Sequence, residues 1–317
     1  MPTIVSRRGF LAITAGMALV AACSSEKPGE VARDGSVTVR HVFGETKIPA
    51  APQRVVSAGF TGQDDLLAVG VVPIAVTEWF GGEPFAVWPW ARPELADAQP
   101  TVLSLTDGIQ VDQITRLKPD LIIATNAGLD ADTYTKLSNI APTIAQSGAD
   151  AFFEPWKDQA TSIGQAVFKN DQMTGLINGV DEKFKTAAAN NPQFNGKKAL
   201  LLGGTLFRDS VQTTTPGWRT DFLTQLGFTI PPVEELIPRD KMAAVLDSAD
   251  VLIWTTESDQ DRDALLADPT IAGLQATARN RHVFTTKDLA GAIAFASPLS
   301  YPLVADQLPP LLARALA

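Results

Sequence analysis

Hydrophobic and polar positions along the chain follow two periods in turn. Short apolar runs typical of buried strands are followed by stretches in which apolar residues recur every three or four positions, as in helices. Alternation of strand and helix favours an α/β layer with a mainly parallel sheet. In the first half, the expected strands are 37–39, 54–57, 73–77, 120–124 and 142–144, and the expected helices are 64–70, 111–117 and 131–140.

The middle of the chain, from Pro155 to Asn190, has no strand signal. Its apolar residues keep the helical period on both sides of a break at 169–171, which predicts two successive helices. The second helix has about 20 residues and would be roughly 30 Å long, about the width of a small domain. This length suits a connector between two lobes.

The strand and helix alternation restarts after Gly196. Expected strands are 199–202, 250–254 and 282–285, and expected helices are 218–226, 240–246, 264–267, 271–278 and 300–316. The sequence therefore predicts an N-terminal lobe at 36–154, a helical segment with the connector at 155–192, and a C-terminal lobe at 193–317. We expect the ligand cleft to lie between the two lobes.

The first 22 residues have the features of an export signal. Arg7 and Arg8 form a twin-arginine pair, and the apolar run that follows, 13–22, is too short to cross a bilayer. Small residues precede Cys23, the only cysteine of the chain. This order predicts a lipoprotein that is cleaved before Cys23, lipidated on it, and held at the outer face of the cytoplasmic membrane by a flexible tether, 23–35.

Charge and composition narrow the possible partners. Loss of the leader removes two arginines and no acid, so the net charge changes from −9 to −11. An acidic surface argues against nucleic acid as the partner and suits a basic surface on another protein. With two histidines, His41 and His282, far apart in sequence and no free thiol after lipidation, no resident metal site is expected.

Ligands of open α/β sheets bind beyond the carboxyl ends of the strands. The segment 79–92 holds three of the six tryptophans, and the facing lobe offers further aromatic and arginine side chains. Rings and guanidinium groups suit a large, partly flat, oxygen-rich ligand. The candidate ligand-binding residues are Trp79, Phe80, Trp88, Trp90, Arg92, Arg208, Trp218, Arg219, Trp254 and Tyr301. The alternative is that the tryptophans fill the core and the arginines lie on the surface.

Signals for catalysis are weak. The chain has no phosphate loop, no HExxH and no G-x-S-x-G nucleophile elbow. The neighbouring acids Asp64-Asp65 and Glu234-Glu235 are interpreted as solvated charges, because adjacent residues on a helix point apart. The sequence therefore favours a binding protein over an enzyme.

Several segments together resemble the iron-siderophore substrate-binding lipoproteins of ABC importers. The most recognisable one is 112–123, Asp-Gln-Ile-Thr-Arg-Leu-Lys-Pro-Asp-Leu-Ile-Ile. The segments 44–57, 65–76, 137–143, 248–252 and 297–300 are also similar to that family. The Trp88-Pro89-Trp90 loop most resembles its actinobacterial and mycobacterial, FecB-like branch. The resemblance runs from about Val37 to the C-terminus.

The resemblance implies two Rossmann-like lobes bridged by a stiff helix, with a shallow cleft that changes little on binding. It also implies that an acid on each lobe docks onto arginines of the membrane permease. Asp112 matches the first of these acids, with Asp where the family usually has Glu. The second is Asp240, with Glu235 as the competitor.

Three functions follow as hypotheses. The first is a monomeric receptor that captures a ferric siderophore and delivers it to an ABC permease, with the iron carried by the cargo and no cofactor of its own. The second keeps the receptor but makes the cargo haem, with Tyr134, Tyr301 or a histidine as axial ligand. The third is an exported chelatase-like α/β enzyme with the same two lobes.

Overall fold

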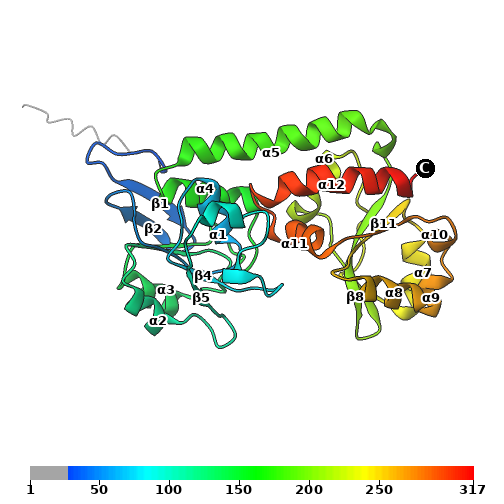
Figure 1. Cartoon of the computed structure of the whole chain (residues 1–317), viewed down its shortest axis with the longest axis horizontal. Helices are drawn as coiled ribbons and strands as arrows, with labels where there is room; N and C mark the ends of the chain where they lie inside the picture. Colours follow the sequence, from blue (N-terminus) through cyan, green and yellow to red (C-terminus); the bar gives the residue numbers. More distant parts are fainter. Residues whose placement is uncertain (1–27) are drawn as a thin grey trace, which may run out of the picture.

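The computed structural model describes residues 28–317, so the predicted leader 1–22 with Arg7 and Arg8, and the predicted lipidation site Cys23, lie outside the described residues. Two lobes stand side by side beneath one long helix (Figure 1). Each lobe contains a five-stranded sheet. The α/β fold class predicted from the sequence is thus confirmed.

The sheet of the N-terminal lobe is parallel throughout, in the order β5-β4-β3-β6-β7. Its strands are β3 (Val55–Ser57), β4 (Ala75–Thr77), β5 (Thr101–Leu103), β6 (Leu121–Ala124) and β7 (Thr143–Ala145). The helices of this lobe are α1 (Gly62–Ala68), α2 (Val111–Leu117) and α3 (Ala131–Ser138), with the 3-10 turns η1 (Pro84–Ala86) and η2 (Arg92–Leu95). Strands β3, β4, β6 and β7 are buried along their whole length, which explains their uninterrupted apolar runs.

A hairpin of β1 (Val37–His41) and β2 (Gly44–Ile48) precedes this sheet. The chain just before the hairpin is already part of the fold, since Gly29 N donates to Thr38 O at 2.9 Å and Val31 bridges to Val37. The flexible tether was predicted to extend to residue 35, which is too far, because backbone hydrogen bonds to β1 hold its last residues in the fold.

The sheet of the C-terminal lobe has the order β10-β9-β8-β11-β12. Its strands are β8 (Ala199–Phe207), β9 (Ser210–Thr213), β10 (Leu236–Pro238), β11 (Val251–Thr255) and β12 (His282–Phe284). Strand β9 is antiparallel to both neighbours, and β8, β11 and β12 are parallel. The helices are α6 (Asp221–Gln225), α7 (Arg239–Leu246), α8 (Asp259–Ala267), α9 (Pro269–Ala272), α10 (Gln275–Ala278), α11 (Lys287–Phe295) and α12 (Ser300–Ala315), with η3 (Pro192–Phe194) and η4 (Trp218–Thr220).

Two helices connect the lobes. Helix α4 (Trp156–Ala166) ends just before the break predicted at 169–171, and α5 (Asn170–Asn190) runs for 21 residues along the top of both lobes (Figure 1). The buried residues of α5, Met173, Val180 and Phe184, lie on one face at helical spacing and join the main core. Within residues 28–317, none of the helices has the length and apolar character needed to cross a membrane.

Residues 286–297, for which the sequence predicted neither a strand nor a helix, contain helix α11. Thr286 begins the helix by accepting a hydrogen bond from Leu289 N, and most of the following residues are small or apolar and buried. The sequence of this stretch shows no helical alternation of apolar and polar residues, because nearly all faces of the helix are buried.

Helix α11 is the part of the C-terminal lobe on which the N-terminal lobe rests. A Cβ atom added to Gly291 would lie 2.5 Å from the Trp88 ring of the other lobe. Next to this contact, Lys287 Nζ donates to Gly81 O and to Glu83 Oε1, each at 2.7 Å. We call the contact of the 81–92 loop with α11 the interlobe seam.

Gly291→Ala is expected to lower the free energy of unfolding by roughly 1–3 kcal/mol, because the added methyl group overpacks the seam against Trp88. The matched control is Gly175→Ala on the exposed side of α5, where a Cβ would meet nothing within 4 Å. The control should gain up to about 1 kcal/mol from helix propensity alone. Denaturant unfolding checks both, and equal stabilisation by the two substitutions would contradict the seam.

Candidate binding cleft

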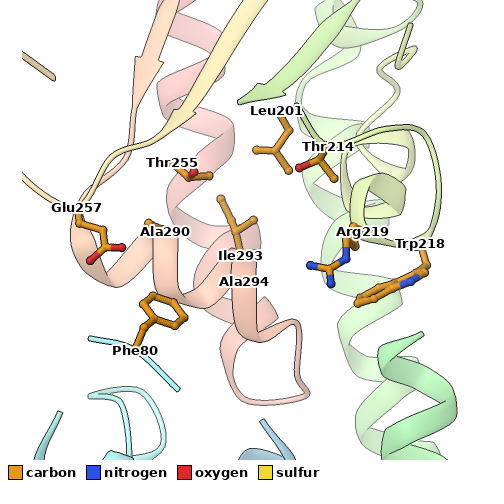
Figure 2. A pocket seen from close by; sticks show the side chains of 10 residues that line it. All are labelled: Phe80, Leu201, Thr214, Trp218, Arg219, Thr255, Glu257, Ala290, Ile293 and Ala294. Atoms are coloured by element: carbon orange, nitrogen blue, oxygen red, sulfur yellow. The ribbon is translucent and has the colours of Figure 1, made fainter. Parts of the chain in front are cut away.

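A cleft lies at the junction of the lobes and has two connected parts. The inner part, about 190 Å³, and the outer part, about 680 Å³, share Thr214, Trp218 and Arg219. Figure 2 shows the inner part, with Phe80 reaching in from the N-terminal lobe and α11 as its back wall. The predicted position of a site between the lobes agrees with this geometry.

The N-terminal lobe contributes a cluster of aromatic rings. Phe60 stacks near Trp79, Phe152 and Phe153, with centroid distances of 5.6 to 6.2 Å. Phe152 and Phe153 line the outer part of the cleft, and Phe152 remains 48% exposed. Trp79 packs behind them against Phe153 at 4.7 Å. The cluster offers ring faces to a ligand at little cost in side-chain entropy.

A buried polar network fixes the loop that carries these two phenylalanines. Asn126 Nδ2 donates to Gln159 Oε1 at 2.6 Å, and Asn126 Oδ1 accepts from Glu154 N at 3.1 Å. Gly128, with φ of +62°, lies so close to Phe152 that a Cβ would be 2.4 Å from its ring. A side chain at position 128 would therefore displace Phe152 and suffer backbone strain.

Arg219 is the cationic group of the cleft. It lies on η4, in a turn closed by Thr220 Oγ1, which donates to Gly217 O at 2.9 Å. Its guanidinium lies 4.5 Å from the Phe153 ring centroid and 4.9 Å from that of Trp218. Burial lowers the pKa of Arg219, although the group stays charged, and no described carboxylate forms an ion pair with it. The group is therefore poised to meet an anionic or oxygen-rich ligand.

Three residues predicted to bind ligand belong to the seam instead. Trp88 is 1% exposed and stacks on Trp90 at 4.9 Å, and Trp90 Nε1 donates to Asp64 Oδ2 at 2.7 Å. Arg92 donates to Glu83 Oε2 at 2.6 Å. None of the three lines either part of the cleft. The ligand-binding prediction is corrected here, because the rings fill the space between the lobes.

Three more predicted residues also lie away from the cleft surface. Trp254 is fully buried in the second core of the C-terminal lobe, where its Nε1 donates to His282 Nδ1 at 2.9 Å. Tyr301 is 2% exposed and packs against Trp156. Arg208 lies at the exposed turn between β8 and β9, beside Phe207. Of the ten predicted residues, Phe80, Trp218 and Arg219 line the cleft and Trp79 supports its wall.

The side chains considered as haem ligands do not reach the cleft. Tyr134 lies beside the β1–β2 hairpin, 3.4 Å from His41 Nε2. His282 is held by Trp254 and by Thr277 Oγ1, at 2.9 Å each. Tyr301 is buried, and burial raises its pKa above the ordinary value. Among the residues that line the described cleft, none is a histidine, tyrosine, cysteine or methionine.

The neighbouring acids Asp64 and Asp65 are buried, so their interpretation as solvated charges is wrong. Asp64 Oδ2 accepts from Ser297 Oγ of the other lobe at 2.7 Å as well as from Trp90, and Asp65 Oδ2 accepts from Gln159 Nε2 at 2.7 Å. Burial raises the pKa of Asp64 to about 6, against the opposing effect of its hydrogen bonds, and raises the pKa of Asp65 well above its usual value. Asp64 thus joins the two lobes.

The residues missed by the sequence analysis are Phe152 and Phe153, together with Thr214, Thr255 and Glu257. The two phenylalanines follow the carboxyl end of β7, and the same rule that selected 79–92 would have selected them. Thr214 and Thr255 carry no distinctive sequence signal, because threonine is common at strand ends.

The two predicted docking acids are both exposed. Asp112 lies in the first turn of α2 and Asp240 in the first turn of α7, one on each lobe and away from α5 (Figure 1). The competitor Glu235 lines the outer part of the cleft. Because Glu235 borders the ligand cleft, Asp240 is the better candidate for the acid that docks onto the permease.

Comparison with known proteins identifies the class to which this fold and cleft belong. The family model for periplasmic binding proteins matches residues 55–290, and the chain belongs to that family. The probable siderophore-binding lipoprotein YfiY of Bacillus subtilis is 29% identical over 265 residues, which cover 81% of this chain and 76% of YfiY. Across the curated relatives, the chain spans between 63% and 76% of their length.

Solved structures agree with this assignment. A periplasmic solute binding protein from Mycobacterium smegmatis is 74% identical, with a TM-score of 0.89, and covers 90% of this chain and 100% of that one. This similarity confirms the predicted mycobacterial branch. PiaA of Streptococcus pneumoniae in complex with ferrichrome shares the fold, with a TM-score of 0.71, 22% identity, and coverage of 88% and 98%.

The buried Asp64 predicts a specific pH dependence of stability. Between about pH 4, near the unfolded pKa, and the folded pKa of about 6, the folded protein keeps a proton that the unfolded chain loses. The stability that the protonated Asp64 contributes is therefore full below pH 4 and is lost as the pH rises through 6. Asp64→Asn does not titrate, so its unfolding free energy relative to wild type should rise by roughly 2–3 kcal/mol from pH 4 to pH 7.5.

Chemical unfolding at a series of pH values measures this difference. The control is Asp112→Asn, an exposed aspartate on α2, whose curve should run parallel to that of the wild type. If Asp64→Asn also ran parallel to the wild type, the raised pKa of Asp64 would be wrong.

Proposed function

We propose that this protein is an extracytoplasmic receptor that binds a ferric siderophore in the interlobe cleft and delivers it to an ABC importer. The observation that carries the proposal is the cleft itself, in which aromatic rings and one unpaired guanidinium from opposite lobes face a common space. Such a site suits a large chelate with flat apolar faces and outward oxygen atoms.

The family supports this reading. YfiY is described as a probable siderophore-binding lipoprotein, and PiaA holds ferrichrome within the same fold. We infer binding rather than catalysis, since family members are substrate-binding proteins and the lining residues include no pair of nucleophile and base. Haem receives less support, because the candidate axial ligands lie elsewhere in the described structure.

The same relatives and the predicted leader support a location outside the cytoplasm. Relatives in this family are lipoproteins or periplasmic proteins. We propose that Cys23 anchors the chain by lipid at the outer face of the cytoplasmic membrane, and that the protein acts as a monomer. Asp112 and Asp240 would then meet arginines of the permease, one acid from each lobe.

Ligand binding is expected to quench tryptophan fluorescence mainly through Trp218, which lines both parts of the cleft. At saturation with ferrichrome, Trp218→Phe should lose more of the quenching amplitude than Trp254→Phe, because Trp218 lines the cleft and Trp254 is buried away from it. Trp254→Phe is the matched control, because that ring is buried in the core away from the cleft.

Gallium ferrichrome, which lacks the electronic transitions of iron, should compete for the site without the same quenching. Absence of saturable binding to ferrichrome, ferric dicitrate and a ferric tricatecholate would contradict the proposed function. Equal loss of amplitude in both tryptophan variants would place the ligand outside this cleft.

Docking to the permease is expected to need both exposed acids. The double substitution Asp112→Ala and Asp240→Ala should reduce iron import by cells to near background, while the dissociation constant for ferrichrome stays within about twofold. The control is Asp171→Ala with Glu182→Ala on α5, which removes the same charge from the other side of the molecule. Normal import by the double Asp112 and Asp240 variant would rule out this docking assignment.

A further inference from the structure

We propose that the cargo of this cleft is a ferric chelate with at most one surplus negative charge, of the hydroxamate class, and not a polyanionic citrate or catecholate complex. This inference rests on the proposed function and names the substrate class of the same site. It follows from the charged side chains that line the cleft and from where they stand.

Among the described residues lining the two parts of the cleft, one is a cation and three are acids: Arg219, Asp150, Glu235 and Glu257. Arg219 and Glu257 lie on opposite sides of the inner part (Figure 2). Asp150 and Glu235 border the outer part together with Arg219. All three acids are exposed, and within residues 28–317 none of them forms an ion pair with a lysine or arginine.

Other cations close to the lobe junction are already engaged. Arg92 and Lys287 both bind Glu83 in the seam, at 2.6 and 2.7 Å. Lys157, in the neighbouring groove beside Trp156, binds Asp181 at 2.7 Å. An incoming polyanion could recruit these groups only by displacing the acids that they already bind.

A polyanionic chelate would therefore meet one guanidinium and three like charges. The inner part of the cleft is walled mainly by ring faces and aliphatic groups, so charges within it interact more strongly than in open water, whereas the outer part is lined mostly by polar side chains. The extra anionic groups would lose their bound water in the cleft, and no further cation there would compensate for that loss. The electrostatics of the site oppose such a ligand even though its size would fit.

A hydroxamate chelate avoids this cost. Three hydroxamate groups balance the charge of ferric iron, which leaves a neutral complex with amide, carbonyl and methylene surfaces. The hydroxyl groups of Thr214 and Thr255 can hydrogen-bond such oxygens, and Trp218 and Phe153 can cover the apolar parts. One surplus carboxylate on the chelate can be held by the Arg219 fork.

Titration calorimetry of the full chain against three probes tests the inference: neutral ferrichrome, ferric dicitrate, and a ferric tricatecholate, all in the same buffer and salt. Ferrichrome should bind at least about tenfold more tightly than either polyanion. The combined substitution Asp150→Asn, Glu235→Gln and Glu257→Gln should tighten the binding of both polyanions relative to ferrichrome and so narrow this gap by about tenfold.

The matched control replaces three exposed acids remote from the cleft, as Glu94→Gln, Asp132→Asn and Asp171→Asn, and so makes the same change in net charge. The gap between the probes should persist in this control. Polyanions binding wild type as tightly as ferrichrome, or an equal effect of both triple variants, would overturn the charge inference and leave the receptor function standing. If none of the three probes binds, the proposed function falls, and the inference with it.

Discussion

The carboxyl group of Asp64 is the contact on which the two-lobe arrangement depends. This fully buried group receives one hydrogen bond from Trp90 in its own lobe and one from Ser297 in the other, both at 2.7 Å. A buried acid left without these donors would be costly, so the lobes gain by staying together. The contact of Trp88 with Gly291 and the ion pair of Lys287 with Glu83 hold the lobes together in the same seam.

The seam and the connector act together on the cleft. Helix α5 fixes the lobes along the top, and the seam fixes them at the 81–92 loop, so relative rotation would have to break packed contacts at two separate places. Arg219 of the C-terminal lobe lies over Phe153 of the N-terminal lobe and so bridges the cleft. A ligand would find the site already formed, which keeps the ordering cost of binding low.

The repeated units and the connector could be predicted from the sequence because buried parallel strands give continuous apolar runs, and α2 and α12 have clear helical periods. The residues that the aromatic loop 79–92 contacts in the other lobe could not be predicted from the sequence. Nothing near Trp88 in sequence shows that Gly291, about two hundred positions later, leaves room for its ring. Asp64 and Asp65 were wrongly interpreted as solvated for the same reason. The parts that bury α1, helix α4 and the other lobe, are distant from it in sequence.

The position of Trp88 and Trp90 in the seam has a consequence for how such receptors can diversify. The contacts that hold the lobes together lie in 81–92, α11 and α5, whereas the outer part of the cleft is lined by other segments, the loop 146–155 and the residues 212–219. Substitutions in these lining segments can therefore alter cargo choice without loosening the joint between the lobes. During evolution, related receptors can therefore change which chelate they bind while they keep the same contacts between the lobes.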